Sequence, residues 1–287
     1  MSVSGHNDGR VSILGQVRRE MVIGTHVSTE VLDVNLSDGI LTLTLNRPSA
    51  LNALNIALKS ALAAAFDAAT YDDRVRTLLI CGAGRAFCAG GDLTEMDPTR
   101  LPSESRARQH QALTEVFLPL LRMPKPVIAA VHGHAHGAGL SLALACDVVV
   151  VGTAAPLSFG YLQRGLTPDG AITYVLPRLV GMARAKELLF SGRRFTGAEA
   201  AEMDLVAVAV DDELVAAEAR KRANHLASGP TVALALTKRI LDQATRCGPE
   251  DLAELEAYSQ AITRATSDHA EGIASFKERR DPSFIGR

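Results

Sequence analysis

The chain has 287 residues, with 30 Lys and Arg against 32 Asp and Glu, and a formal net charge of −2 at pH 7. This length suits one large domain or two, and the small net charge provides no basic field for nucleic acid or an anionic membrane. The four cysteines form no Cys-x-x-Cys pair, so we expect reduced thiols, a cytoplasmic location and no structural metal.

The first half of the chain predicts alternating strands and helices. Residues 1–30 lack a long apolar run and are interpreted as a loosely ordered N-terminal arm, neither signal peptide nor anchor. Residues 31–45 alternate apolar and polar side chains around Asp38-Gly39, which predicts a β-hairpin. A helix is expected within 51–69, and buried strands within 75–84, 125–133 and 146–152. This order indicates an α/β protein with a largely parallel sheet.

One uncharged stretch, residues 127–146, is long enough to span a membrane. It contains His132, His134 and His136 as well as three glycines, which a helix facing lipid would tolerate poorly. We therefore expect a buried strand followed by a buried helix. The three histidines have no nearby carboxylate in sequence, so they are interpreted as structural and not as metal ligands.

Past residue 195 the sequence becomes helical. Thr196 and Glu199 form a predicted capping box, and helical patterns dominate from Asp212 to Arg280. Apolar stripes recur there at three- and four-residue steps: Leu252, Leu255, Tyr258 and Ile262, then Ala270, Ile273 and Phe276. These stripes pack either against the chain's own sheet or against a neighbouring subunit.

Two glycine-rich turns, in residues 86–96 and 131–147, each follow an expected strand and precede an expected helix. Glycine allows close approach to the backbone, and the first amides of a helix lack partners, so such turns suit an oxygen that carries negative charge. Neither turn has a nucleotide-binding spacing. The GLSLA segment around Ser141 departs from the nucleophile elbow GxSxG, and its strand ends too early, so a nucleophilic serine is not favoured.

These turns, together with PRLVGMARAKELLFSGRRFTGAEAAEMDLV and FKERRDPSFIGR, strongly resemble the enoyl-CoA hydratase/isomerase, or crotonase, superfamily from about Val31 to Arg287. The resemblance implies a ββα spiral core over 31–211 and a helical trimerisation region over 212–287, assembling as a homotrimer or a dimer of trimers. It also implies an acyl-CoA thioester as substrate, no permanently bound cofactor, no metal, and no nucleic-acid or membrane partner.

The resemblance also implies roles for individual residues. The backbone amides of Gly91 and Ala138 would hold the thioester oxygen and stabilise an enolate. Coenzyme A would lie along two segments, RPSALNAL and AGGDL, and the matching contact positions are Ala50, Leu51, Ala53, Ala89, Asp92 and Leu93.

The departures from the hydratase pattern point to another reaction. Ser141 and Tyr161 stand where the resemblance implies the two hydratase glutamates, and tyrosine is a poor base at pH 7. Asp169 matches the working aspartate of isomerases in this superfamily, although TPDG is also an ordinary turn sequence. The leading hypothesis is an acyl-CoA isomerase with Asp169 as base. The alternatives are a hydratase or hydrolase using other groups, and an acyl-CoA-binding protein that has lost the chemistry.

Overall fold

The computed structural model describes residues 26–287, and the fold begins with the predicted hairpin. Strands β2 (Leu32–Ser37) and β3 (Ile40–Leu45) pair antiparallel. Asp38 and Gly39 join them with φ of 54° and 75°, as a tight hairpin turn requires. The expectation of a loosely ordered arm is wrong for residues 26–28, because His26–Ser28 form strand β1 and pair with β2. The rest of that arm lies outside the described residues.

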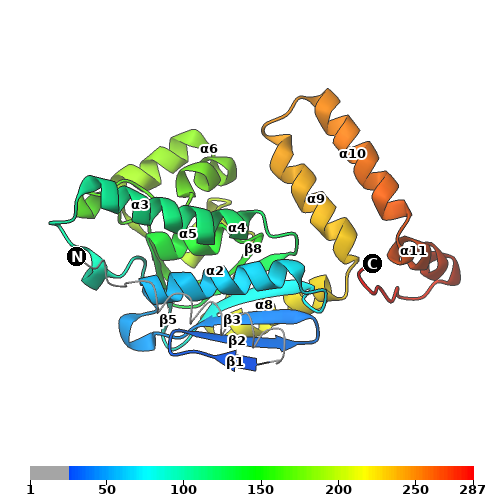
Figure 1. Cartoon of the computed structure of the whole chain (residues 1–287), viewed down its shortest axis with the longest axis horizontal. Helices are drawn as coiled ribbons and strands as arrows, with labels where there is room; N and C mark the ends of the chain where they lie inside the picture. Colours follow the sequence, from blue (N-terminus) through cyan, green and yellow to red (C-terminus); the bar gives the residue numbers. More distant parts are fainter. Residues whose placement is uncertain (1–25) are drawn as a thin grey trace, which may run out of the picture.

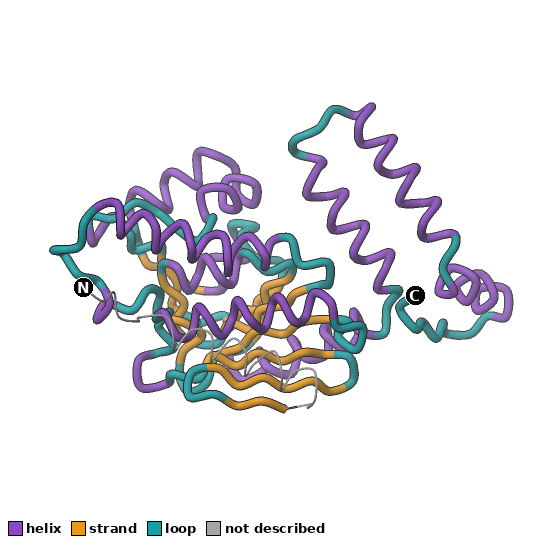
Figure 2. Tube along the Cα trace, in the orientation of Figure 1, coloured by secondary structure: helices purple, strands orange, loops and turns teal. Residues whose placement is uncertain are grey.

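The main sheet has the strand order β1-β2-β3-β4-β6-β8-β11. From β3 onward the strands β4 (Thr77–Gly82), β6 (Val127–Val131), β8 (Val148–Gly152) and β11 (Val208–Val210) are all parallel. Helix α2 (Ile56–Tyr71) connects β3 to β4 and begins at an Asn55 cap, whose side chain accepts from the Leu58 amide at 2.8 Å. The largely parallel α/β sheet predicted from the sequence is therefore confirmed (Figure 2).

A smaller sheet runs beside the first in the order β10-β9-β7-β5. Its strands β5 (Ala86–Cys88), β7 (His134–His136) and β9 (Pro156–Ser158) follow β4, β6 and β8 along the chain, and β10 is Arg194–Thr196. Helices α5 (Ala138–Leu144) and α6 (Ile172–Ser191) come after β7 and β9, which gives the expected ββα repeat. The stretch 127–146 is thus strand and buried helix. No helix in residues 26–287 is long and apolar enough to cross a bilayer.

The main sheet is buried on both faces. On one face, α8 (Val215–Ala227) packs Val215, Ala219 and Ala223 against strand residues that include Ile128 and Val150. The larger core on the other face includes α2, α5 and part of α6. The remaining elements are α3 (Pro102–Ala112), the π-helical η3 (Leu113–Phe117), α4 (Leu118–Leu121), α7 (Gly197–Glu202) and the 3-10 turns η1 (Pro48–Ala50), η2 (Leu93–Glu95), η4 (Leu162–Arg164) and η5 (Asp212–Leu214). The capping box of Thr196 and Glu199 is present at the start of α7.

Three C-terminal helices stand away from the sheets: α9 (Thr231–Ala244), α10 (Pro249–Arg264) and α11 (Ser267–Glu278) (Figure 1). The expected helical region begins at residue 212, but α8 packs on the sheet, so the separate part starts only at α9. The predicted apolar stripes are only partly covered in the single chain: Leu252 and Leu255 are half-buried, whereas Tyr258 is 69% and Phe276 84% exposed. Within this chain they have no sheet to cover.

Candidate active site

The two glycine-rich turns press backbone against backbone. A Cβ atom at Gly90, where φ is +104°, would lie 2.7 Å from the carbonyl oxygen of His136. A Cβ atom at Gly139 would lie 2.3 Å from the carbonyl oxygen of Cys88. Such distances exclude any side chain, which explains the small residues that the sequence places in both turns. This contact brings the turns of Gly91 and Ala138 together, because the same Gly90 position is only 3.7 Å from the Ala138 nitrogen.

The amides of Gly91 and Ala138 are available as hydrogen-bond donors. In residues 26–287 neither N–H donates to an acceptor of the chain, although the Leu54 amide donates to Gly90 O at 2.7 Å next door. Ala138 is the first residue of α5, where amides have no partner within the helix. The two turns therefore present a pair of unpaired donors, an arrangement that can bind a thioester oxygen and stabilise it as charge develops.

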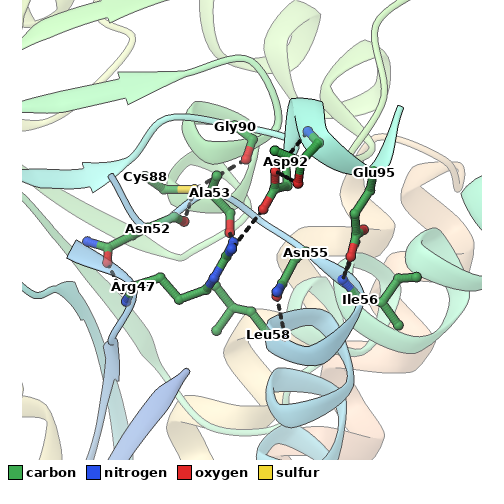
Figure 3. A network of polar contacts seen from close by, with 11 residues as sticks. Arg47, Asn52, Ala53, Asn55, Ile56, Leu58, Cys88, Gly90, Asp92 and Glu95 are labelled. Atoms are coloured by element: carbon green, nitrogen blue, oxygen red, sulfur yellow. Dashed lines mark hydrogen bonds and ion pairs between the residues drawn. The ribbon is translucent and has the colours of Figure 1, made fainter. Parts of the chain in front are cut away.

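The RPSALNAL segment runs alongside the first turn (Figure 3). Leu51 and Asn52 have φ of 50° and 58°, and the Leu51 carbonyl accepts from the Ala89 amide at 2.9 Å. The side chain of Asn52 is fully buried, accepts from the Arg47 amide and donates to Ala86 O at 2.8 Å. These bonds fix the segment against the glycine-rich turn of residues 86–96. Ala50 is the last residue of η1, and Ala53 is buried.

Asp92 holds the same region together. Its carboxylate pairs with the Arg47 guanidinium at 2.8 Å and accepts from the Thr94 hydroxyl at 2.7 Å. The Thr94 hydroxyl and the Arg47 charge keep the pKa of Asp92 below its ordinary value. The Asp92 carboxylate is thus bonded to protein groups and stabilises the local structure. The neighbouring Leu93 is 57% exposed. The coenzyme contacts at these positions stay a prediction.

Ser141 and Tyr161 bond to each other. Their hydroxyl oxygens lie 2.8 Å apart, and the Ser141 hydroxyl also reaches the Gly137 carbonyl at 3.2 Å. Tyr161 is 7% exposed, and its burial raises the pKa of the phenol well above the ordinary value. At neutral pH the phenol is therefore uncharged and does not act as a base.

Asp169 lies beside this pair. The Tyr161 hydroxyl donates to the Asp169 carbonyl at 3.4 Å, and a Cβ atom at Gly170 would lie 2.8 Å from Cβ of Ser141. The Oδ1 atom of Asp169 is buried and has no partner in residues 26–287. Burial raises the pKa of Asp169, while the Tyr161 hydroxyl and the charge of Lys59 lower it in part. A carboxylate with one buried, unpartnered oxygen and a raised pKa is suited to accept a proton.

One charged side chain near Asp169 was not predicted from the sequence. Lys59 lies close enough to Asp169 to affect its pKa, and it is the sole charged residue in residues 56–66. Two of the histidines bond to other protein groups. Nδ1 of His134 lies 3.2 Å from Nε2 of His136, and Nδ1 of His136 lies 2.9 Å from the Ser158 hydroxyl. Burial lowers the pKa of His136 to about 4.

Comparisons with known proteins identify the family. The family model of enoyl-CoA hydratase/isomerase matches residues 35–287. The chain belongs to this family. It is 36% identical over 255 residues to the 1,2-epoxyphenylacetyl-CoA isomerase of Escherichia coli K12, covering 88% of this chain and 97% of that protein. It is 35% identical over 256 residues to the 2,3-dehydroadipyl-CoA hydratase of the same organism, covering 89% and 99%.

Solved structures of the family share the fold. A crystal structure of an enoyl-CoA hydratase/isomerase from Cupriavidus metallidurans CH34 superposes with a TM-score of 0.85 at 32% identity, covering 91% of this chain and 98% of that one. The crotonase-like fold inferred from the sequence is therefore confirmed. The relatives include proteins named as isomerase and as hydratase, so the family alone does not distinguish the two reactions.

Proposed function

We propose that this enoyl-CoA hydratase/isomerase family member is an acyl-CoA isomerase that moves a proton between carbons of the acyl chain. The observation that carries the proposal is the buried, unpartnered carboxylate oxygen of Asp169, held beside Ser141 and Tyr161. A single base that takes a proton from one carbon and returns it to another is sufficient for this reaction. The E. coli relative named as an isomerase supports the same class.

In the proposed reaction the acyl-CoA thioester oxygen accepts hydrogen bonds from the amides of Gly91 and Ala138. Loss of a proton from carbon to Asp169 turns the thioester into an enolate, whose negative oxygen these two amides stabilise. One such donor is typically worth about 2.7 to 4 kcal/mol of the barrier. The protonated Asp169 then returns the proton to a different carbon, which shifts the double bond. This chemistry requires no resident cofactor or metal.

Hydration is less well supported, because it needs a group that activates water and a group that delivers a proton. Ser141 and Tyr161 hold the two positions implied for those glutamates, and their hydroxyls are bonded to each other at 2.8 Å. Neither is a carboxyl group, and the phenol is uncharged at neutral pH. A hydratase or hydrolase would have to recruit water through Asp169 alone. A protein that only binds acyl-CoA would leave Asp169 without a catalytic role.

Deuterium exchange at carbon distinguishes these hypotheses. Wild type and Asp169→Asn are mixed with crotonyl-CoA and a β,γ-unsaturated isomer in heavy water, and label is followed by NMR. We expect the wild type to incorporate deuterium and interconvert the isomers without forming a 3-hydroxyacyl product, and Asp169→Asn to do neither. Accumulation of the hydroxyacyl thioester would indicate a hydratase. Binding without any exchange would indicate a binding protein.

We also propose that the chain assembles as a trimer or a dimer of trimers through its C-terminal helices. The support is the exposed apolar surface on α10 and α11, where Tyr258, Ile262 and Phe276 are 69%, 53% and 84% exposed. Side chains of this size are seldom left uncovered in a cluster. Sedimentation of a monomer at micromolar concentration would contradict this proposal.

A further inference from the structure

A pocket lies between α2 and the α3–η3 segment and is lined by both apolar and charged side chains. The pocket opens to solvent, and Ile56 and Val116 form part of its apolar wall. Lys59 and Arg108 also line it, from opposite helices. The residue after Val116 is Phe117, whose ring would lie 2.9 Å from a Cβ atom at Gly170. The pocket is therefore next to the segment that carries Asp169.

Lys59 is a half-buried cation in the wall of this pocket. Its ammonium has no hydrogen bond or ion pair with any of residues 26–287. Burial lowers the pKa of Lys59, while the charges of Glu95, Asp169 and Asp92 raise it in part. Burial disfavours the charged ammonium and no acceptor within residues 26–287 bonds to it, so a bound anion would stabilise its charged form.

Three carboxylates raise the pKa of Lys59: Asp92 and Glu95, which are bonded to other groups, and Asp169. Asp92 is paired with Arg47 at 2.8 Å. Both oxygens of Glu95 accept from the Ile56 amide, at 2.9 and 3.1 Å.

Glu115, on η3, is the acidic residue in the pocket lining. Its carboxylate accepts from the side chain of Gln111 at 2.9 and 3.0 Å. Arg108, one helical turn before Ala112, has no ion pair within residues 26–287. Two cations from opposite walls thus lack an anion of their own.

We propose that the acyl group of the substrate carries a terminal carboxylate, which binds in this pocket between Lys59 and Arg108. The apolar wall of Ile56 and Val116 would contact the methylene chain that leads to it. The substrate class would then be the coenzyme A thioesters of dicarboxylic acids. This inference rests on the proposed function in one respect: the thioester oxygen must bind to the amides of Gly91 and Ala138, near Asp169.

The test measures binding and does not depend on turnover. Full-length protein is titrated calorimetrically with glutaryl-, adipyl- and pimelyl-CoA, and with the monocarboxylic thioesters of equal carbon number, pentanoyl-, hexanoyl- and heptanoyl-CoA. We expect at least one dicarboxylic thioester to bind roughly tenfold or more tightly than its partner, because hydrogen bonds to charged groups are strong. The preference should weaken as salt is raised, since the Arg108 side is open to solvent.

Matched variants locate the preference. Lys59→Met keeps the length of the side chain and should remove the preference, and Arg108→Gln should reduce it. Lys186→Met, an exposed lysine on α6 outside the pocket, should leave it unchanged. Equal affinities within every pair, or a preference that persists in Lys59→Met, would overturn the carboxylate site while the acyl-CoA site stands. Failure to bind any of the six thioesters would overturn this inference together with the proposed function.

Discussion

Replacing Asp169 by Asn should stabilise the protein at neutral pH while abolishing proton transfer. The Oδ1 atom of Asp169 is buried without a partner, and burial raises the pKa of this carboxyl group. Asn has nearly the same size and suits the same turn, but it is never charged. The general-base contribution that is lost is typically about 10² to 10⁴ in rate, and it should appear in kcat far more than in KM.

The size and pH dependence of the stability gain follow from the burial. An unsatisfied buried polar group costs about 1 to 3 kcal/mol, and because the Asn amide still lacks some partners, we expect a net gain of about 1 kcal/mol. For a chain of this size that corresponds to a Tm increase of about 2 °C. The pKa of Asp169 in the folded state is above its ordinary value of 3.8. Between these two pKa values the folded state therefore binds more protons than the unfolded state. Wild-type stability therefore falls as pH rises through that window.

Thermal unfolding followed by circular dichroism at pH 7 and pH 5 checks this expectation. The advantage of Asp169→Asn should be largest at neutral pH and narrow as the pH is lowered through the raised pKa of Asp169, because the wild-type carboxyl group then takes up its proton. Asp211→Asn, at an exposed aspartate without a side-chain cap bond, serves as the control and should show no such trend. A lower Tm for Asp169→Asn at pH 7, or a shift independent of pH, would refute the reasoning.

Three further predictions concern other parts of the site and the assembly. Tyr161→Phe removes a hydroxyl that helps to hold down the pKa of Asp169, so the acidic limb of the kcat/KM profile should move to higher pH; an unmoved limb contradicts this role. Gly139→Ala places a methyl group 2.3 Å from the Cys88 carbonyl, which should cost about 1 to 3 kcal/mol of stability, and an unchanged Tm would contradict the packing argument. Phe276→Asp should shift sedimentation toward the monomer, whereas an unaltered trimer would place the interface elsewhere.

The sequence predicts best those features that depend on neighbouring residues. The hairpin follows from Asp38-Gly39, which adopt positive φ in the structure, and the capping box of Thr196 and Glu199 is equally local. The strands of the smaller sheet were not predicted as such, because each has only three residues. A segment that short shows no periodicity. Strand β1 was missed for the same reason.

The site was only partly predictable, because its contacts join distant residues. The sequence indicates that small residues are needed at Gly90 and Gly139, but the carbonyl groups that exclude a side chain belong to the other turn. For Asp169 the resemblance favours a catalytic base over a turn residue, but the sequence does not show that one carboxylate oxygen is buried without a partner. Lys59 was missed, although a single charge in an apolar helix segment is a signal that could have found it.

The interlocked glycine turns have a consequence for solvent exchange. The amides of Gly91 and Ala138 have no acceptor within residues 26–287, so their hydrogens can exchange with water without any opening of the fold. Most of their neighbours in α5 and the strands are held by hydrogen bonds and exchange only when the structure opens. In an amide exchange map, these two positions should stand out as fast sites inside a slow core. A bound thioester would slow both together, which makes them a direct reporter of occupancy.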